Sequence, residues 1–218
     1  MSSDRLWTYQ YMCTDMMGRY GKAQESYKNG KLHGERQVYE DGHLLERGFF
    51  QNGKPEGERK TWYKNGQLWE QEFYQNGQLE GERKSWHLNG QLNVRQFHRG
   101  GRFEGEYKIW SETGRLLERE SYHDGRHDGK CQSWYENGNP HERHFYGNGK
   151  LKGEFKRWDV DGTIVKHRFY LKNGNVYGNY CNWERKYTHT FLNIRKCLHS
   201  RHSPDFSLYI ISDLLPIF

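Results

Sequence analysis

The sequence predicts an all-β protein: an elongated, single-layer array of antiparallel β-hairpins with a short α-helical tail at the C-terminal end. One observation is that a short unit recurs from Gly18 to Trp183, so that residues 52–68 and 76–92 are nearly the same stretch. The other is the composition. Only 33% of residues are hydrophobic, yet 16% are aromatic and recur on a fixed period, which favours a thin repeat sheet over a disordered chain.

The turns set the period of this array. Glycines that mostly follow Asn or Asp are separated alternately by 11 and 13 residues, which gives a 24-residue unit of two strands and two tight turns. Asn-Gly and Asp-Gly pairs are typical of type I′ hairpin turns, and we expect that turn at each of them. The spacings before Gly42 and Gly174 differ by one residue, as expected of units at the ends of an array.

Stacking the units brings equivalent residues into columns. A glycine inside one strand of each unit predicts a bulge that bends the strand. We expect the tryptophan and tyrosine columns to interleave into one aromatic spine that replaces a globular core. The glycine column is Gly34, Gly57, Gly81, Gly105, Gly129 and Gly153; the tryptophan column follows Tyr39 with Trp62, Trp86, Trp110, Trp134, Trp158 and Trp183; the tyrosine column is Phe50, Tyr74, His98, Tyr122, Tyr146 and Tyr170.

Charged residues form two further columns, one mostly glutamate and one mostly arginine. Like charges directly across a sheet repel, so we expect opposite charges on the strands between them, and a solvated, salt-bridged face. Breaks in the columns mark positions where specificity could reside. The glutamate column is Glu46, Glu70, Val94, Glu118, Glu142 and Lys166, the arginine column beside it is Arg47, Gln71, Arg95, Arg119, Arg143 and His167, and the breaks are Val94, His98, Ser121 and Lys166.

Three segments follow from these patterns. Residues 1–17 are expected to form an N-terminal cap with one strand, residues 18–183 the repeats, and residues 184–218 a helical tail. The tail is basic on its outer side, which suggests contact with an anionic partner or docking on a membrane surface. Its candidate contact residues are Arg185, Lys186, Arg195 and Lys196.

The cysteines and the N-terminus indicate the compartment. Four cysteines without paired spacing favour a reducing environment, and no signal peptide is evident at the N-terminus. The longest apolar run, residues 206–218, is shorter than the roughly 20 residues that span a bilayer. We therefore expect an intracellular, cytoplasmic protein.

The unit resembles the MORN repeat, and specifically its variant type, with the pattern NGxLxGExxxWyxNGxLxxxxxY. Residues 76–92 show the pattern, and the resemblance covers about three quarters of the chain. It implies a hairpin array that serves as a scaffold or interaction module. MORN repeats elsewhere are associated with membrane phospholipids, and some bacterial variant-repeat proteins are described as antitoxin-like. These associations supply two alternative hypotheses: membrane-surface association and binding of a toxin partner.

Motifs for catalysis are not found in the sequence. It has no P-loop, no dinucleotide-binding GxGxxG and no GxSxG, and its histidine pairs, such as His123 with His127, are poorly spaced for a metal. Glutamate columns nearly as numerous as the basic ones leave no evident basic stripe for nucleic acid. We therefore predict a non-enzymatic scaffold for protein–protein interaction, with no cofactor and no metal.

Overall fold

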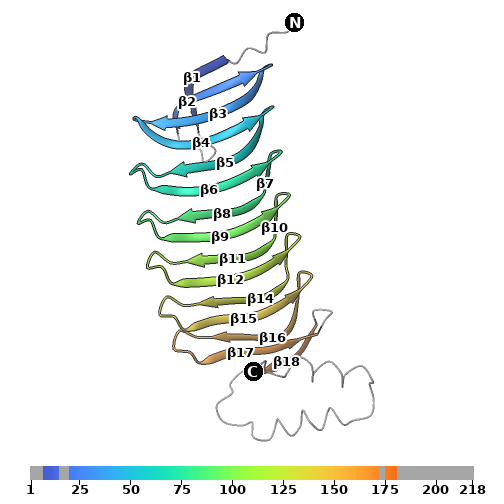
Figure 1. Cartoon of the computed structure of the whole chain (residues 1–218). Coiled ribbons are helices and arrows are strands. Elements are labelled where there is room, and N and C mark those ends of the chain that lie inside the picture. Colours follow the sequence, from blue (N-terminus) through green and yellow to red (C-terminus); the bar gives the residue numbers. More distant parts are fainter. Residues whose placement is uncertain (1–6, 15–19, 172–174, 181–218) are drawn as a thin grey trace, which may run out of the picture. The chain divides into compact units, whose positions relative to one another are not determined.

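The computed structural model describes residues 7–14, 20–171 and 175–180, and every regular element in these ranges is a β-strand. All of them belong to one antiparallel sheet (Figure 1). The strands are β1 (Trp7–Thr14), β2 (Tyr20–Lys28), β3 (Lys31–Glu40), β4 (His43–Gln51), β5 (Lys54–Trp62), β6 (Leu68–Gln75), β7 (Gln78–Leu79), β8 (Gly81–Trp86), β9 (Leu92–Arg99), β10 (Arg102–Phe103), β11 (Gly105–Trp110), β12 (Leu116–His123), β13 (Arg126–His127), β14 (Gly129–Trp134), β15 (Pro140–Gly147), β16 (Lys150–Trp158), β17 (Ile164–Tyr170) and β18 (Val176–Tyr180).

The strands pair in the order of the sequence, which confirms the predicted single-layer hairpin array. The pairing begins with β1, which lies along the whole of β2, from Trp7 opposite Tyr27 to Thr14 opposite Tyr20. Segments β7 and β8 act as one strand divided in two, as do β10 with β11 and β13 with β14. Among the described residues, no helix has the length and apolar composition needed to cross a membrane. The helices predicted within 184–218 lie outside the described residues.

The turns are of two kinds, so the prediction of a type I′ turn at every Asn-Gly is wrong for three of the seven in the described residues, those at Asn65, Asn89 and Asn137. Asn52 and Gly53 both have positive φ, 53° and 82°, as a two-residue type I′ turn requires. At the other end of the unit the loop has three residues. There the Gly66 amide donates to the Tyr63 carbonyl and the Tyr63 amide to the Gln67 carbonyl, both at 2.9 Å, and only the glycine has positive φ.

This difference also explains the short spacing before Gly42. Asp41 and Gly42 both have positive φ, and Glu40 lies directly opposite His43. The first unit therefore has a two-residue turn where the later units have a three-residue loop, and one residue fewer is needed.

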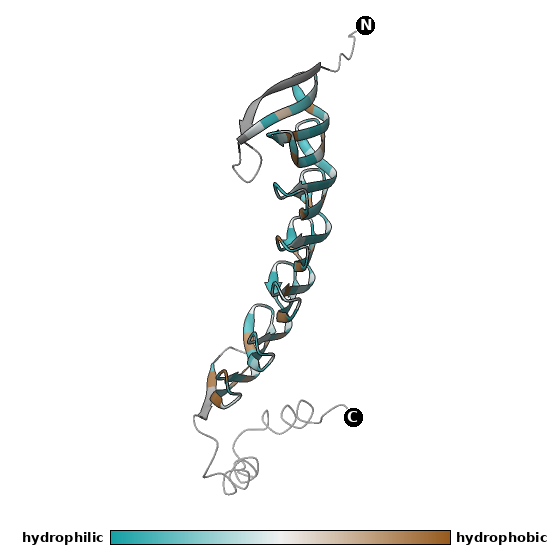
Figure 2. Cartoon of the chain, turned by 90° about the vertical axis from the view of Figure 1, so that its left-hand side faces the viewer, coloured by the Kyte–Doolittle hydropathy of each residue, from teal (hydrophilic) through white to brown (hydrophobic). Residues whose placement is uncertain are grey.

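The glycine column produces the predicted bulges. All six glycines have positive φ, from 68° at Gly153 to 111° at Gly129, a region where a side chain is strained. Phe49 pairs with Glu56 and Arg47 with Lys60, so three residues of β5 face a single residue of β4. The strands arch in Figure 1 and appear as curls in Figure 2, as expected when each carries a bulge.

One face of the sheet, here called the inner face, carries most of the buried side chains, and they are mostly polar. The buried apolar residues are few among those described: Ala23, Val38, Leu45, Cys131 and Phe155. Many of the rest are charged, including Glu46, which is fully buried. The hydrophilic colouring of most strands in Figure 2 agrees with this. The glutamate column therefore lies inside, which corrects the expectation of a solvated face.

The predicted interleaving of tryptophan with tyrosine is wrong, and a shorter row of neighbouring rings runs from His98 to Tyr146 instead. The tyrosine column interleaves with the second residue after each type I′ turn, so that Tyr122 lies directly opposite His127. The tryptophans lie at the other end of the strands, where Trp86 pairs with Leu92 beside a three-residue loop. Ring centroids are 4.8 Å apart for His98 and Phe103, 5.0 Å for Phe103 and Tyr122, 4.3 Å for Tyr122 and His127, and 4.8 Å for His127 and Tyr146.

Candidate functional site

The N-terminal half of the inner face holds a ladder of buried ion pairs. Arg36 binds Glu25 and Glu46, each at 2.6 Å. Arg59 continues the ladder to Glu46 at 3.3 Å and to Glu72 at 2.6 Å, and Arg83 binds Glu72 at 2.8 Å. Burial disfavours the charged guanidinium of Arg59, but Glu46 and Glu72 outweigh it and raise its pKa. Arg36 and Arg59 are thus neutralised by carboxylates of both flanking strands, and Arg83 by carboxylates of β6 alone.

The ladder changes chemistry in the C-terminal half. The column that begins with Arg36, Arg59 and Arg83 continues as Tyr107, Cys131 and Phe155. The carboxylates Glu118 and Glu120 are retained on β12, but within the described part of the chain neither forms an ion pair with an arginine or lysine. Burial, and to a lesser extent the negative charge of the neighbouring Glu120, raises the pKa of Glu118 to about 7.

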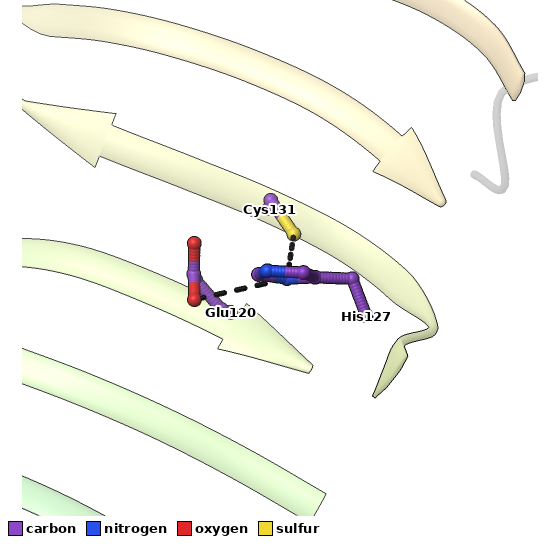
Figure 3. Close-up of side chains that lie close together, drawn as sticks. All are labelled: Glu120, His127 and Cys131. Atoms are coloured by element: carbon purple, nitrogen blue, oxygen red, sulfur yellow. Dashed lines mark hydrogen bonds and ion pairs between the residues drawn. The ribbon is translucent and has the colours of Figure 1, made fainter. Parts of the chain in front are cut away.

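Glu120, His127 and Cys131 form a cluster in this half (Figure 3). The His127 Nδ1 lies 3.8 Å from the Glu120 Oε2 and 3.8 Å from the Cys131 Sγ. Tyr122 donates its hydroxyl proton to Glu120 at 2.6 Å, and its oxygen is 3.2 Å from the His127 Nε2. The three ligand atoms come from three neighbouring segments, β12, β13 and β14.

The Cys131 thiol is protonated at neutral pH in this setting. Burial raises its pKa to about 11, and its side chain is almost completely buried. Burial also lowers the pKa of His144, which lies directly opposite Cys131 on β15. A neutral, buried thiol is a poor nucleophile, so Cys131 is not poised for covalent catalysis.

On the opposite face, here called the outer face, a row of mostly basic residues crosses the sheet. Each member lies directly opposite the next on the neighbouring strand, so Arg47 faces Lys60 and Arg95 faces both Lys84 and Lys108. The expected alternation of opposite charges is therefore wrong, and the basic stripe judged absent from the sequence is present. The basic row is Gln37, Arg47, Lys60, Gln71, Lys84, Arg95, Lys108, Arg119, Gln132, Arg143, Lys156 and His167.

A second row on the outer face explains how these like charges coexist. It alternates glutamate with phenylalanine, and each glutamate binds cations of the basic row. Glu58 accepts from Lys60 at 2.8 Å, and Glu82 accepts from Arg95 at 2.5 Å. Lys60 helps to lower the pKa of Glu58. The phenylalanines are partly exposed, Phe49 by 43% and Phe73 by 39%, and Arg95 lies over the Phe97 ring at 5.0 Å.

The second row breaks once, between β12 and β14. Lys130 stands where the other units have glutamate, and Ser121 where they have phenylalanine. Lys130 is exposed and forms no ion pair with another described residue. Burial, and to a lesser extent the positive charges of Arg143 and Arg119, lowers the pKa of Lys130. The break therefore leaves three cations together.

Comparison with known families decides what the array is. Four segments match the model of the family described as the MORN repeat variant: residues 55–78, 79–98, 103–124 and 128–146. Residues 55–146 therefore carry four MORN repeats of the variant type. No sequence among the curated proteins matched it in the comparison.

The four matched MORN repeats contain both features described above. The Glu120, His127 and Cys131 cluster and the break at Lys130 lie in the third and fourth matched segments and the short link between them. Of the predicted signature residues, the glycines form the bulges, and Trp62, Trp86, Trp110, Trp134 and Trp158 end their strands beside the three-residue loops. Trp183 and the candidate contacts Arg185, Lys186, Arg195 and Lys196 lie outside the described residues.

Proposed function

We propose that this MORN repeat protein is a non-enzymatic scaffold whose outer face binds an acidic segment of a partner protein. The observation that carries the proposal is the pairing of the basic row with partly exposed phenylalanines over many strands. Together the two rows contain nine lysines and arginines against five glutamates, an excess of four positive charges. Arginine and aromatic side chains are enriched where proteins bind one another.

The charge surplus favours an acidic segment in particular. Arg47 and Arg119 each keep half of their side-chain surface exposed, so a carboxylate of the partner can reach them. At the break around Lys130 the array's own glutamate is missing, and an acidic side chain of the partner would take its place. Complementary charge steers association and fixes the register of the partner on a periodic surface.

The phenylalanines argue for a protein over a phosphate-bearing ligand. Phe73 and Phe97 stand between the charged positions, and their exposed rings add apolar area that a phosphate group does not use. A lipid surface or nucleic acid would be held chiefly by its phosphates. The motifs that the sequence lacks and the protonated state of Cys131 support the absence of catalysis.

The test compares three forms of the full chain on extract from the host cell. One is the wild type. The second carries Arg119→Gln, Lys130→Gln and Arg143→Gln, since glutamine already occupies the row at Gln71 and Gln132. The third is a control of equal charge change at three exposed lysines of the type I′ turns: Lys31→Gln, Lys54→Gln and Lys150→Gln.

We expect one partner to cross-link to the outer face of the wild type and the control, and to be lost from the second form. Titration of the purified partner should then show weaker binding as salt concentration rises. Equal binding by all three forms would overturn the proposal. So would salt-sensitive sedimentation with phosphatidylserine vesicles in place of any protein partner.

A further inference from the structure

The cluster of Glu120, His127 and Cys131 can be compared with the residues at the equivalent positions two repeat units earlier. There Glu72 binds Arg59 at 2.6 Å and Arg83 at 2.8 Å. Forty-eight residues later the carboxylate is kept as Glu120, but both arginines are replaced, by Tyr107 and Cys131. The apolar Leu79 is replaced at the same time by His127.

These replacements remove two cations and supply two metal ligands. The Glu120 side chain is only 14% exposed, so its charge lies largely out of water, where an unpaired carboxylate is costly. Its ionic neighbour among the described residues is His127, whose Nδ1 lies 3.8 Å from the Glu120 Oε2. We propose that Glu120, His127 and Cys131 bind a zinc ion, which supplies the positive charge that Arg59 and Arg83 supply to Glu72.

The geometry suits tetrahedral zinc. With Zn–S of about 2.3 Å and Zn–N of about 2.0 Å, two ligands of a tetrahedron lie about 3.5 Å apart. The Nδ1 of His127 lies 3.8 Å from both the Cys131 Sγ and the Glu120 Oε2, and the three ligand atoms lie within 4.8 Å of one another. Side-chain rotations that bring the Glu120 carboxylate and the Cys131 Sγ, which lie within 4.8 Å of each other, closer together would close the site. A thiolate, an imidazole and a carboxylate leave the fourth position for water.

Tyr122 sets the histidine tautomer that the site requires. Its hydroxyl donates to Glu120, so its oxygen is left to accept a hydrogen bond from the His127 Nε2–H. The Nδ1, which faces Glu120 and Cys131 in Figure 3, then carries the lone pair. Such outer partners orient the ligands of known metal sites. The His127 side chain is 34% exposed, which gives the ion a route from solvent, and binding displaces the thiol proton of Cys131.

Cobalt(II) and zinc(II) are the probes for the full-length chain. Cobalt bound by a thiolate gives a charge-transfer band in the near ultraviolet, and zinc displaces it. The test protein carries Cys13→Ser, Cys181→Ser and Cys197→Ser, so that Cys131 is its one thiol. We expect the band, one zinc per chain by calorimetry, and a melting temperature that rises with zinc.

Three variants of this protein assign the ligands. Cys131→Ser should abolish the band and weaken zinc binding by at least about 100-fold, and Tyr122→Phe should weaken it by about 10- to 100-fold. The double change Cys131→Arg with His127→Leu restores the residues of the earlier unit, and it should fold without responding to zinc. A missing band in the test protein, or zinc affinity unchanged by Cys131→Ser, would overturn the proposal.

Discussion

Arg59 is the position at which the buried ladder can be tested most directly. Its side chain is 5% exposed and lies between Glu46, which is completely buried, and Glu72, which is 6% exposed. The change Arg59→Met keeps most of the aliphatic volume and removes the charge. Two carboxylates then each lose one partner and stay out of water.

The cost can be estimated from what each carboxylate retains. Removing one partner of a buried ion pair costs about 3–5 kcal/mol. Glu46 keeps Arg36 and Glu72 keeps Arg83, so we expect the lower end, about 3 kcal/mol. This is a large part of the roughly 5–15 kcal/mol that keeps a domain folded. With a slope of about 1–3 kcal/mol per molar urea, the unfolding midpoint should fall by about 1–3 M.

The assay is equilibrium urea unfolding followed by tryptophan fluorescence. The matched control is Arg47→Met, which breaks the Arg47–Glu35 pair on the outer face, where Arg47 is half exposed. An exposed pair contributes about 0–1 kcal/mol. Adding Glu46→Gln to Arg59→Met should recover part of the loss, because it neutralises one of the stranded carboxylates. If Arg59→Met costs no more than Arg47→Met, the ladder does not stabilise the sheet.

Three further predictions concern the bulges, the pH dependence and the metal. Gly81 has a φ of 81° and open space where a Cβ would stand. The change Gly81→Ala should therefore lower the free energy of unfolding by about 1–2 kcal/mol through backbone strain alone, and Gly81→Asn should lower it less. Equal urea midpoints for both variants and the wild type would contradict this. Burial, and to a lesser extent the charge of Arg83, lowers the pKa of His98 below the usual value of about 6.5. As pH drops below that value, the unfolded chain therefore binds a proton at this histidine before the folded protein does, and the stability of the fold should fall. His98→Tyr, the residue of its column, should make this fall shallower in urea unfolding at several pH values, and an unchanged slope would count against it. Zinc should slow amide hydrogen exchange across β12, β13 and β14 but leave β4 and β5 unchanged, whereas uniform slowing would mean that zinc acts elsewhere.

The fold followed from the sequence because its signals are local and repeated. The turn glycines and the glycine column are each read within a few residues, and the structure places them as predicted, in turns and in bulges. Which residues share a face could not be read in the same way. The bulge at Gly57 sets three residues of β5 against one of β4, and the register then depends on whether each turn has two or three residues.

The two features assigned to binding were missed for this reason. The basic row appears only when the register places Arg119 against Lys108 and Gln132. The metal cluster was missed because histidines were compared with one another along the chain, and His127 was paired with His123. A usable signal did exist in the columns, since Cys131 interrupts the series of Arg36, Arg59 and Arg83.

The interruptions on the two faces coincide, and that is hard to attribute to independent drift. Lys130 and Cys131 are consecutive on β14, so one points to the outer face and the other to the inner face. On β12, the consecutive residues Glu120 and Ser121 show the same division. An ion that joins β12 to β14 from the inside would also hold Arg119, Lys130 and Arg143 at a fixed spacing on the outside. A rigid cation group binds an acidic segment with less loss of conformational freedom than a mobile one, so the zinc site and the proposed binding face would support each other.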